Sequence, residues 1–154
     1  MTCHTILLAV APSANELRGS LDTLAQRHTD IAHRGADLVL SWRRRFRKGT
    51  LPFRLVRLGG ESNTLLRWRC AGAGCLPRGG RVELTELQDI LVPLPDAVRG
   101  RIWDFERRRI EINHEYALLT YAHARLVDLE RHRSALAQLR RLGAARNLDK
   151  AGRL

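Results

Sequence analysis

The sequence has no long apolar run and few cysteines, and these scarcities exclude several classes of protein. No stretch approaches the roughly 18 consecutive apolar residues of a membrane-spanning helix, so we expect no contact with a membrane. The three cysteines, Cys3, Cys70 and Cys75, are an odd number and predict no disulfide framework, which favours a cytoplasmic location. The apolar run at residues 6–11 is short and follows no Lys or Arg, so a secretory signal is not expected.

Catalytic and cofactor motifs are also missing. The chain contains no Walker, GxGxxG, GxSxG or HExxH sequence, and its closely spaced cysteines supply only two of the four ligands of tetrahedral zinc. Asp30-x-x-His33 and Glu111-x-x-His114 have the spacing of di-metal helical bundles, and a metal enzyme built on them is one alternative. Neither pair lies on an apolar seam, where such ligands must point. We therefore expect no enzyme, no cofactor and no metal.

Acidic residues are scarce in one part of the chain. Between residues 43 and 69 there are nine basic residues and only Glu61 as an acid, a net charge of +8 out of +11 for the whole chain. A GC-rich coding bias accounts for the use of 25 Arg against two Lys, but it does not explain this clustering. Concentrated positive charge is typical of a surface that binds a polyanion.

Two long amphipathic helices are predicted from heptad spacing. The first covers residues 13–48, with Ser13 and Glu16 as a capping box and Gly49 as the stop. The second covers residues 96–142, after Pro95 and before Gly143, and residues 143–154 are expected to form a flexible tail. We expect the two helices to pair antiparallel, with contacts that bring together Trp42 and Ile102, Gly35 and Arg109, His28 and Tyr116, and Leu21 and His123.

The segment between the helices predicts a β-hairpin over residues 52–70, with its turn at residues 59–63. Alternation places five apolar residues on one face, and Arg54, Arg67 and Arg69 on the other, while Arg57 falls on the apolar side. A Gly-rich loop at 71–82 and a short helix at 83–92 are expected to follow. The aromatic residues Trp42, Phe53 and Trp68 should be core, which leaves Phe46 as the more exposed ring.

These elements predict a single domain over residues 1–154 of the mainly α (α+β) class. It has two long antiparallel amphipathic helices with a β-hairpin at one end. Residues 43–48, the hairpin, Arg99 and Arg101 should gather at that end. Because a helix of about 30 residues spans roughly 45 Å, the other end should be far from this charge.

The segment Leu65-Leu66-Arg67-Trp68-Arg69 and the later Glu106-Arg107-Arg108-Arg109-Ile110-Glu111-Ile112-Asn113 carry a resemblance to a known group of proteins. The chain resembles the small uncharacterised accessory proteins encoded on bacterial integrative and conjugative elements and related plasmids, in layout over residues 40–130. The resemblance implies a cytoplasmic accessory protein of a mobile element, with no catalytic residues. Cys70, Cys75 and the Gly-rich loop are not features of that group.

We therefore expect a non-enzymatic protein that binds nucleic acid, most simply DNA, through phosphate contacts. The alternative is a protein–protein adaptor that pairs with a helical partner or forms a homodimer through its heptad helices. Helical pairing with neighbouring acids should neutralise the second basic run, Arg107 to Arg109. The expected nucleic-acid-binding residues, called here the basic cluster, are Arg43, Arg44, Arg45, Arg47, Lys48, Arg54, Arg57, Arg67 and Arg69.

Overall fold

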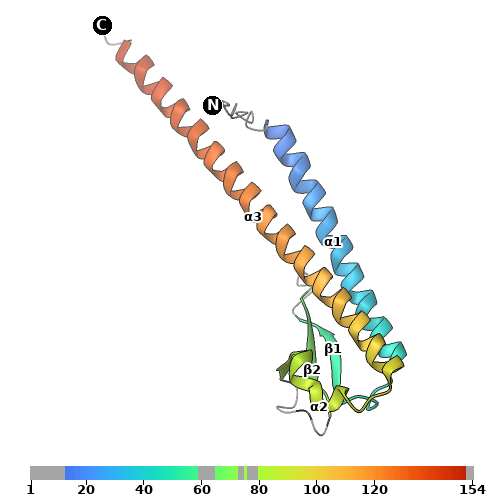
Figure 1. Ribbon diagram of the computed structural model, residues 1–154. Coiled ribbons are helices and arrows are strands. Elements are labelled where there is room, and N and C mark those ends of the chain that lie inside the picture. Colours follow the sequence, from blue (N-terminus) through green and yellow to red (C-terminus); the bar gives the residue numbers. More distant parts are fainter. Residues whose placement is uncertain (1–12, 59–64, 73–74, 76–79, 152–154) are drawn as a thin grey trace, which may run out of the picture. The chain divides into compact units, whose positions relative to one another are not determined.

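The computed structural model describes residues 13–58, 65–72, 75 and 80–151, and it is mainly helical with a small antiparallel sheet (Figure 1). This confirms the mainly α (α+β) class. The expectations for the apolar run at 6–11, for the hairpin turn at 59–63 and for much of the Gly-rich loop lie outside the described residues. The elements in chain order are α1 (Ala14–Arg45), β1 (Phe53–Arg57), β2 (Leu66–Cys70), β3 (Arg81–Val82), the 3-10 helix η1 (Leu84–Leu87), α2 (Gln88–Leu91) and α3 (Asp96–Ala151).

The chain divides into two compact units, and each is described by itself. One unit combines residues 1–25 and 121–154, and the other is the continuous segment 26–120. In the first unit, the predicted capping box is present: the Ser13 N–H donates to the Glu16 carboxylate, and the Glu16 N–H donates to the Ser13 hydroxyl at 3.2 Å. Leu17, one turn further on, is almost fully buried.

In the second unit, α1 and α3 run antiparallel. The predicted partners His28 and Tyr116 are in edge-to-face contact, with ring centroids 5.2 Å apart. Further along, the rings of Trp42 and Phe105 also lie 5.2 Å apart. The residue numbers of the contacting pairs increase along α1 and decrease along α3, so the predicted antiparallel pairing is confirmed within this unit.

The sheet has the strand order β1-β2-β3, and both neighbouring pairs are antiparallel. Phe53 pairs with Cys70 and Leu55 with Trp68, so apolar side chains face each other across the two longer strands. All four are at most 2 % exposed. The predicted apolar face is thus confirmed, and it packs with α1 and α3 into one core. The core side chains of this unit include Ile31, Leu38, Trp42, Phe53, Leu55, Leu66, Trp68, Leu84, Leu87, Leu91, Ile102, Ile112 and Leu119.

Polar side chains of α3 attach that helix to the sheet at Leu66. The Asn113 side chain accepts from the Leu66 N–H at 2.8 Å and donates to the Leu66 carbonyl at 2.9 Å. Strand β3 pairs only with Trp68 and Arg69, so it does not reach Leu66. Asn113 therefore takes the place of a strand neighbour and satisfies backbone groups of a residue that is fully buried.

Strand β3 corrects the expectation of a loop over residues 71–82. Its two residues are too few to produce a detectable alternation, and their pairing depends on β2, which is distant in the sequence. The expected helix at 83–92 is present in two short pieces, because η1 forms a 3-10 turn before α2 begins.

The helix ends also differ from expectation. α1 ends at Arg45 rather than Lys48, and Arg47 and Thr50 then close a turn in which Gly49 has a φ of 90°, a conformation that favours glycine. α3 continues through Gly143 to Ala151, where a tail was expected. One interior glycine costs only up to about 1 kcal/mol, and the two alanines that follow it in the sequence are strong helix formers.

A disulfide joins Cys70 and Cys75, with a Cα–Cα separation of 5.3 Å. This corrects the expectation of no disulfide. The pair was not predicted because the number of cysteines is odd, with Cys3 left without a partner cysteine in the sequence. The sequence also does not show how close Cys70 and Cys75 lie across the Gly-rich loop.

Candidate nucleic-acid interface

The end of α1 and the sheet together carry the basic cluster. Arg43, Arg44 and Arg45 form the last turn of α1 and are exposed, and Arg47 and Lys48 follow in the turn that leads to β1. On the strands, alternation places Arg54, Arg67 and Arg69 on the face opposite the buried Phe53 and Trp68. Arg57 lies on the other face, in line with Phe53 and Leu55, so the structure separates it from the three strand arginines.

Three arginines form a row across the exposed face of the sheet. Arg54 of β1 is the direct partner of Arg69 on β2, and Arg69 is in turn the partner of Arg81 on β3. Arg81 is not among the predicted residues, because β3 was not expected. Of the three, Arg81 has an acidic neighbour, and it donates to Glu83 at 2.7 Å. Like charges directly opposite on neighbouring strands repel each other, so this row costs stability unless an anion neutralises it.

The basic cluster forms no ion pair with the acidic residues that the structure describes. Six arginines elsewhere in the described chain do pair with Asp or Glu, namely Arg34, Arg81, Arg99, Arg107, Arg109 and Arg125. The pairs of Arg107 with Asp104 and of Arg109 with Glu106 confirm the expected neutralisation of these two members of the second basic run. Arginines of α1 and α3 such as Arg18, Arg27 and Arg101 also form no ion pair within the described part of the chain, so what distinguishes the basic cluster is the concentration of its nine cations within residues 43–69.

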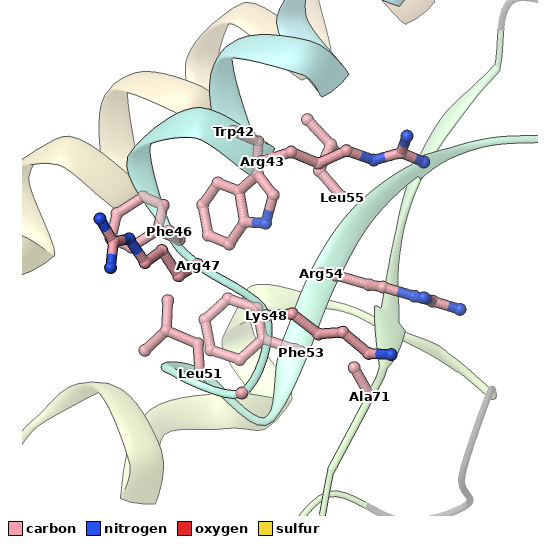
Figure 2. A pocket seen from close by; sticks show the side chains of 11 residues that line it. Trp42, Arg43, Phe46, Arg47, Lys48, Leu51, Phe53, Arg54, Leu55 and Ala71 are labelled. Carbon is pink, nitrogen blue, oxygen red and sulfur yellow. The ribbon is translucent and has the colours of Figure 1, made fainter.

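A recess of about 310 Å³ lies between the end of α1 and β1 (Figure 2). Trp42, Phe46, Leu51, Phe53 and Leu55 supply its apolar wall, and four members of the basic cluster surround it. Figure 2 shows the head groups of Arg43, Lys48 and Arg54 on one side of the rings, and that of Arg47 on the other. The described residues that line the recess include no Asp or Glu.

The rings at the recess belong to a connected aromatic cluster. Trp42 lies 4.3 Å from Phe46 and 5.9 Å from Phe53, measured between ring centroids. Trp42 and Phe53 are each 2 % exposed, as expected for core residues, whereas Phe46 is only half-buried. The expectation that Phe46 is the more exposed ring is confirmed. Phe46 is therefore the most exposed of the three rings that line the recess.

A polar group behind the sheet holds Trp68 in place. The Trp68 indole N–H donates to Glu106 at 2.6 Å, and Arg109 donates to the same carboxylate at 2.7 Å. Burial raises the pKa of Glu106, but the hydrogen bonds from Arg109 and Trp68 outweigh it and leave the pKa below its ordinary value of 4.5. The same hydrogen bond raises the pKa of Arg109. Glu106 thus links Trp68 of β2 to α3, and its ion pair with Arg109 has a structural role.

Other candidates from the sequence have different positions or partners. Arg99, expected at the basic end, donates to the carbonyls of Val92 and Leu94 and pairs with Asp96, so it holds the turn before α3. His33 and His114, from the two metal-like spacings, are exposed. No group of three or more metal-ligating side chains occurs among the described residues.

No helix in the described part of the chain is long and apolar enough to cross a membrane. Comparison of the chain with protein-family models, with curated proteins and with solved structures gives no match.

Proposed function

We propose that this chain is a non-enzymatic accessory protein that binds DNA through the phosphate backbone, in the maintenance or transfer of a mobile genetic element. The observation that carries the proposal is the basic cluster, whose nine cations have no acidic partner among the described residues. The role in a mobile element is inferred separately. It rests on the resemblance of the Leu-Arg-Trp-Arg segment and of the helix around residues 106–113 to accessory proteins of integrative and conjugative elements and plasmids.

Phosphate binding is the simplest use of these side chains. Arginine presents a planar fork of N–H donors that matches phosphate oxygens, and eight of the nine cations are arginines. Four of them stand on short, regular strands, and three form the end of a helix, so their backbones are held in place. A row of arginines that repel one another gains stability when phosphates neutralise it.

Fluorescence anisotropy with labelled DNA and a salt titration tests the proposal. If about six phosphates are neutralised, the logarithm of the binding constant should fall with the logarithm of salt with a slope near −5 on duplex DNA. We expect micromolar or tighter binding at low salt. Absence of binding at low salt would refute the proposal.

An acidic protein partner is the main competing explanation, and polyglutamate of matched charge tests it as a competitor. Arginines arranged for DNA should prefer phosphates, which accept their hydrogen bonds at the regular spacing of the sugar–phosphate backbone, over the carboxylates of a flexible polypeptide. Competition by polyglutamate as strong as that by unlabelled DNA would move the assignment to an acidic polypeptide.

A second candidate function is self-association, and an exposed apolar stripe on α3 favours it. Trp103, Ile110 and Leu118 are 50 %, 52 % and 57 % exposed, and spacings of seven and eight residues place them on one side of the helix. A twofold axis at Ile110 would set Trp103 of one copy beside Leu118 of the other, as an isologous dimer requires. The seam residues His28, Trp42, Phe105 and Tyr116 already face each other within one chain, so the stripe is the surface left for a second copy.

Light scattering at high salt tests this dimer. The dimer mass should persist in high salt and should fall to the monomer mass in Trp103→Arg. Leu40→Arg is the matched control, because Leu40 is a 46 % exposed apolar residue of α1 outside the stripe. A monomeric wild-type chain would remove this second candidate.

The proposal places the protein in the cytoplasm, with its nucleic-acid partner. Disulfides are rare in that compartment, so Cys70 and Cys75 should be thiols in growing cells and should join only on oxidation. Their state in cells is therefore a test of location.

A further inference from the structure

We infer that the recess beside Phe46 receives an unpaired nucleobase, which makes single-stranded nucleic acid the preferred ligand of the basic cluster. The inference rests on the proposed function and adds to it a site, a ligand class and a strand preference. It assigns Phe46 as the residue on which the base stacks.

The size and the wall of the recess fit one base. Its volume of about 310 Å³ is at the lower end of the range for small-ligand sites, which begins near 300 Å³. Trp42 and Phe53, each 2 % exposed, and the buried Leu51 and Leu55 line the recess. Phe46 is the half-buried ring in this wall, so a flat ligand gains its aromatic contact there.

Four cations surround this apolar wall and can bind the phosphates on either side of a base. Arg43 belongs to the last turn of α1, Arg47 and Lys48 follow that helix, and Arg54 belongs to β1, and all four line the recess. Figure 2 shows the head groups of Arg43, Lys48 and Arg54 on one side of the rings and that of Arg47 on the other. If a base occupies the recess, its 5′ phosphate can lie beside the cations on one side of the rings and its 3′ phosphate beside the cation on the other side.

This combination favours an unpaired strand over a duplex. In a duplex the bases are stacked and paired, so the phosphates can reach the cations but no base can enter the recess without being flipped out. A basic surface with an accessible aromatic ring is the arrangement of single-strand binding sites, where stacking is tolerant of sequence. DNA and RNA share this chemistry, and the experiment includes both.

The test is fluorescence anisotropy with four labelled ligands of equal length: oligo(dT), oligo(U), a duplex, and oligo(dT) with abasic sites. Stacking of one base corresponds to a roughly 5- to 150-fold change in affinity. The wild-type full-length chain should therefore bind oligo(dT) or oligo(U) at least about five-fold more tightly than the abasic strand. This comparison needs no variant, so a folding defect cannot confuse it.

Phe46→Leu removes the flat ring and keeps the apolar volume. The affinity of this variant for the single strand should fall by the same factor as that caused by removing the bases. Its affinities for the duplex and for the abasic strand should equal those of the wild-type chain. Phe105→Leu is the matched control, because Phe105 is half-buried and contacts both Trp42 and Phe46 but does not line the recess. It should leave the single-strand preference intact.

The outcomes separate the two proposals. Equal affinity for base-containing, abasic and duplex ligands would overturn the recess assignment, while the phosphate-binding function would stand. A loss with Phe105→Leu equal to that with Phe46→Leu would also overturn it. Absence of binding to every ligand would remove the proposed function and the recess assignment together.

Discussion

Arg54 and Arg69 are direct partners on neighbouring antiparallel strands, and both lie on the face of the sheet away from the core. A sheet selected for stability alone would place an acid or an uncharged residue at one of the two positions, because opposed like charges destabilise a strand pair. The structure keeps arginine at both and adds Arg81 on the far side of Arg69. The row is thus a feature that costs stability in the free protein and that an anion relieves.

Arg69→Thr is predicted to stabilise the fold and to weaken binding to nucleic acid. The change relieves repulsion from both Arg54 and Arg81, and threonine favours strands, so the free energy of unfolding should rise by about 0.5 kcal/mol at low salt. High salt should remove most of this gain. Arg67→Thr is the matched control, because Arg67 has Val56 as its partner and should show no such gain. Urea unfolding at low and high salt measures both variants.

Acid should destabilise the protein through Glu106. Its carboxyl pKa lies below 4.5 in the folded chain, so as the pH falls through that value the unfolded chain binds a proton first. The stabilisation is present above pH 4.5 and is lost below it. In Glu106→Gln, the free energy of unfolding should be lower at neutral pH and should fall less steeply in acid. An unchanged pH slope in this variant would contradict the assigned role of the Glu106–Arg109 pair.

Asn113→Ala should be strongly destabilising. It leaves the N–H and carbonyl of Leu66 without their Asn113 partner in a fully buried position, which costs about 1 to 3 kcal/mol. Asn113→Asp keeps only the acceptor and should give an intermediate loss. Thermal unfolding measures both. A stability equal to wild type in Asn113→Ala would show that Asn113 does not hold the edge of β2.

The sequence predicts the architecture well wherever a regular pattern repeats. The heptad spacing locates α1 and α3 and the contact between His28 and Tyr116, and strand alternation separates Phe53 and Leu55 from Arg54. Ser13 and Glu16 form the capping box that their spacing predicts.

Features that depend on contacts between distant segments escape such patterns. Strand β3 has only two residues, and with it Arg81 was missed, although an arginine followed by Val82 and Glu83 is compatible with a short strand. The attachment of Asn113 to Leu66 joins residues 47 apart, and no local signal marks it. The recess depends on the approach of β1 to the end of α1, which the sequence does not specify. For the same reason no pattern in the sequence indicates that Cys70 and Cys75 are joined.

The redox state of Cys70 and Cys75 in cells is predicted to be reduced. Cells are quenched with acid, and free thiols are then labelled with a maleimide polymer that slows the protein on a gel. All three cysteines should be labelled in growing cells, and only one after treatment with a mild oxidant. A pair that is already oxidised in growing cells would contradict the cytoplasmic location. It would leave the DNA-binding proposal to be tested on its own.

The most direct measurement compares the affinity for DNA of two charge-reversed variants. Arg67→Glu with Arg69→Glu, and Arg140→Glu with Arg141→Glu, each reduce the net charge from +11 to +7, but only the first pair lies in the basic cluster. Arg140 and Arg141 are exposed residues of α3. We expect the first variant to lose affinity and to lower the salt slope by about two with no loss of thermal stability, while the second remains close to wild type. Equal losses in the two variants, or unchanged binding in the first, would show that the basic cluster is not the surface that binds DNA.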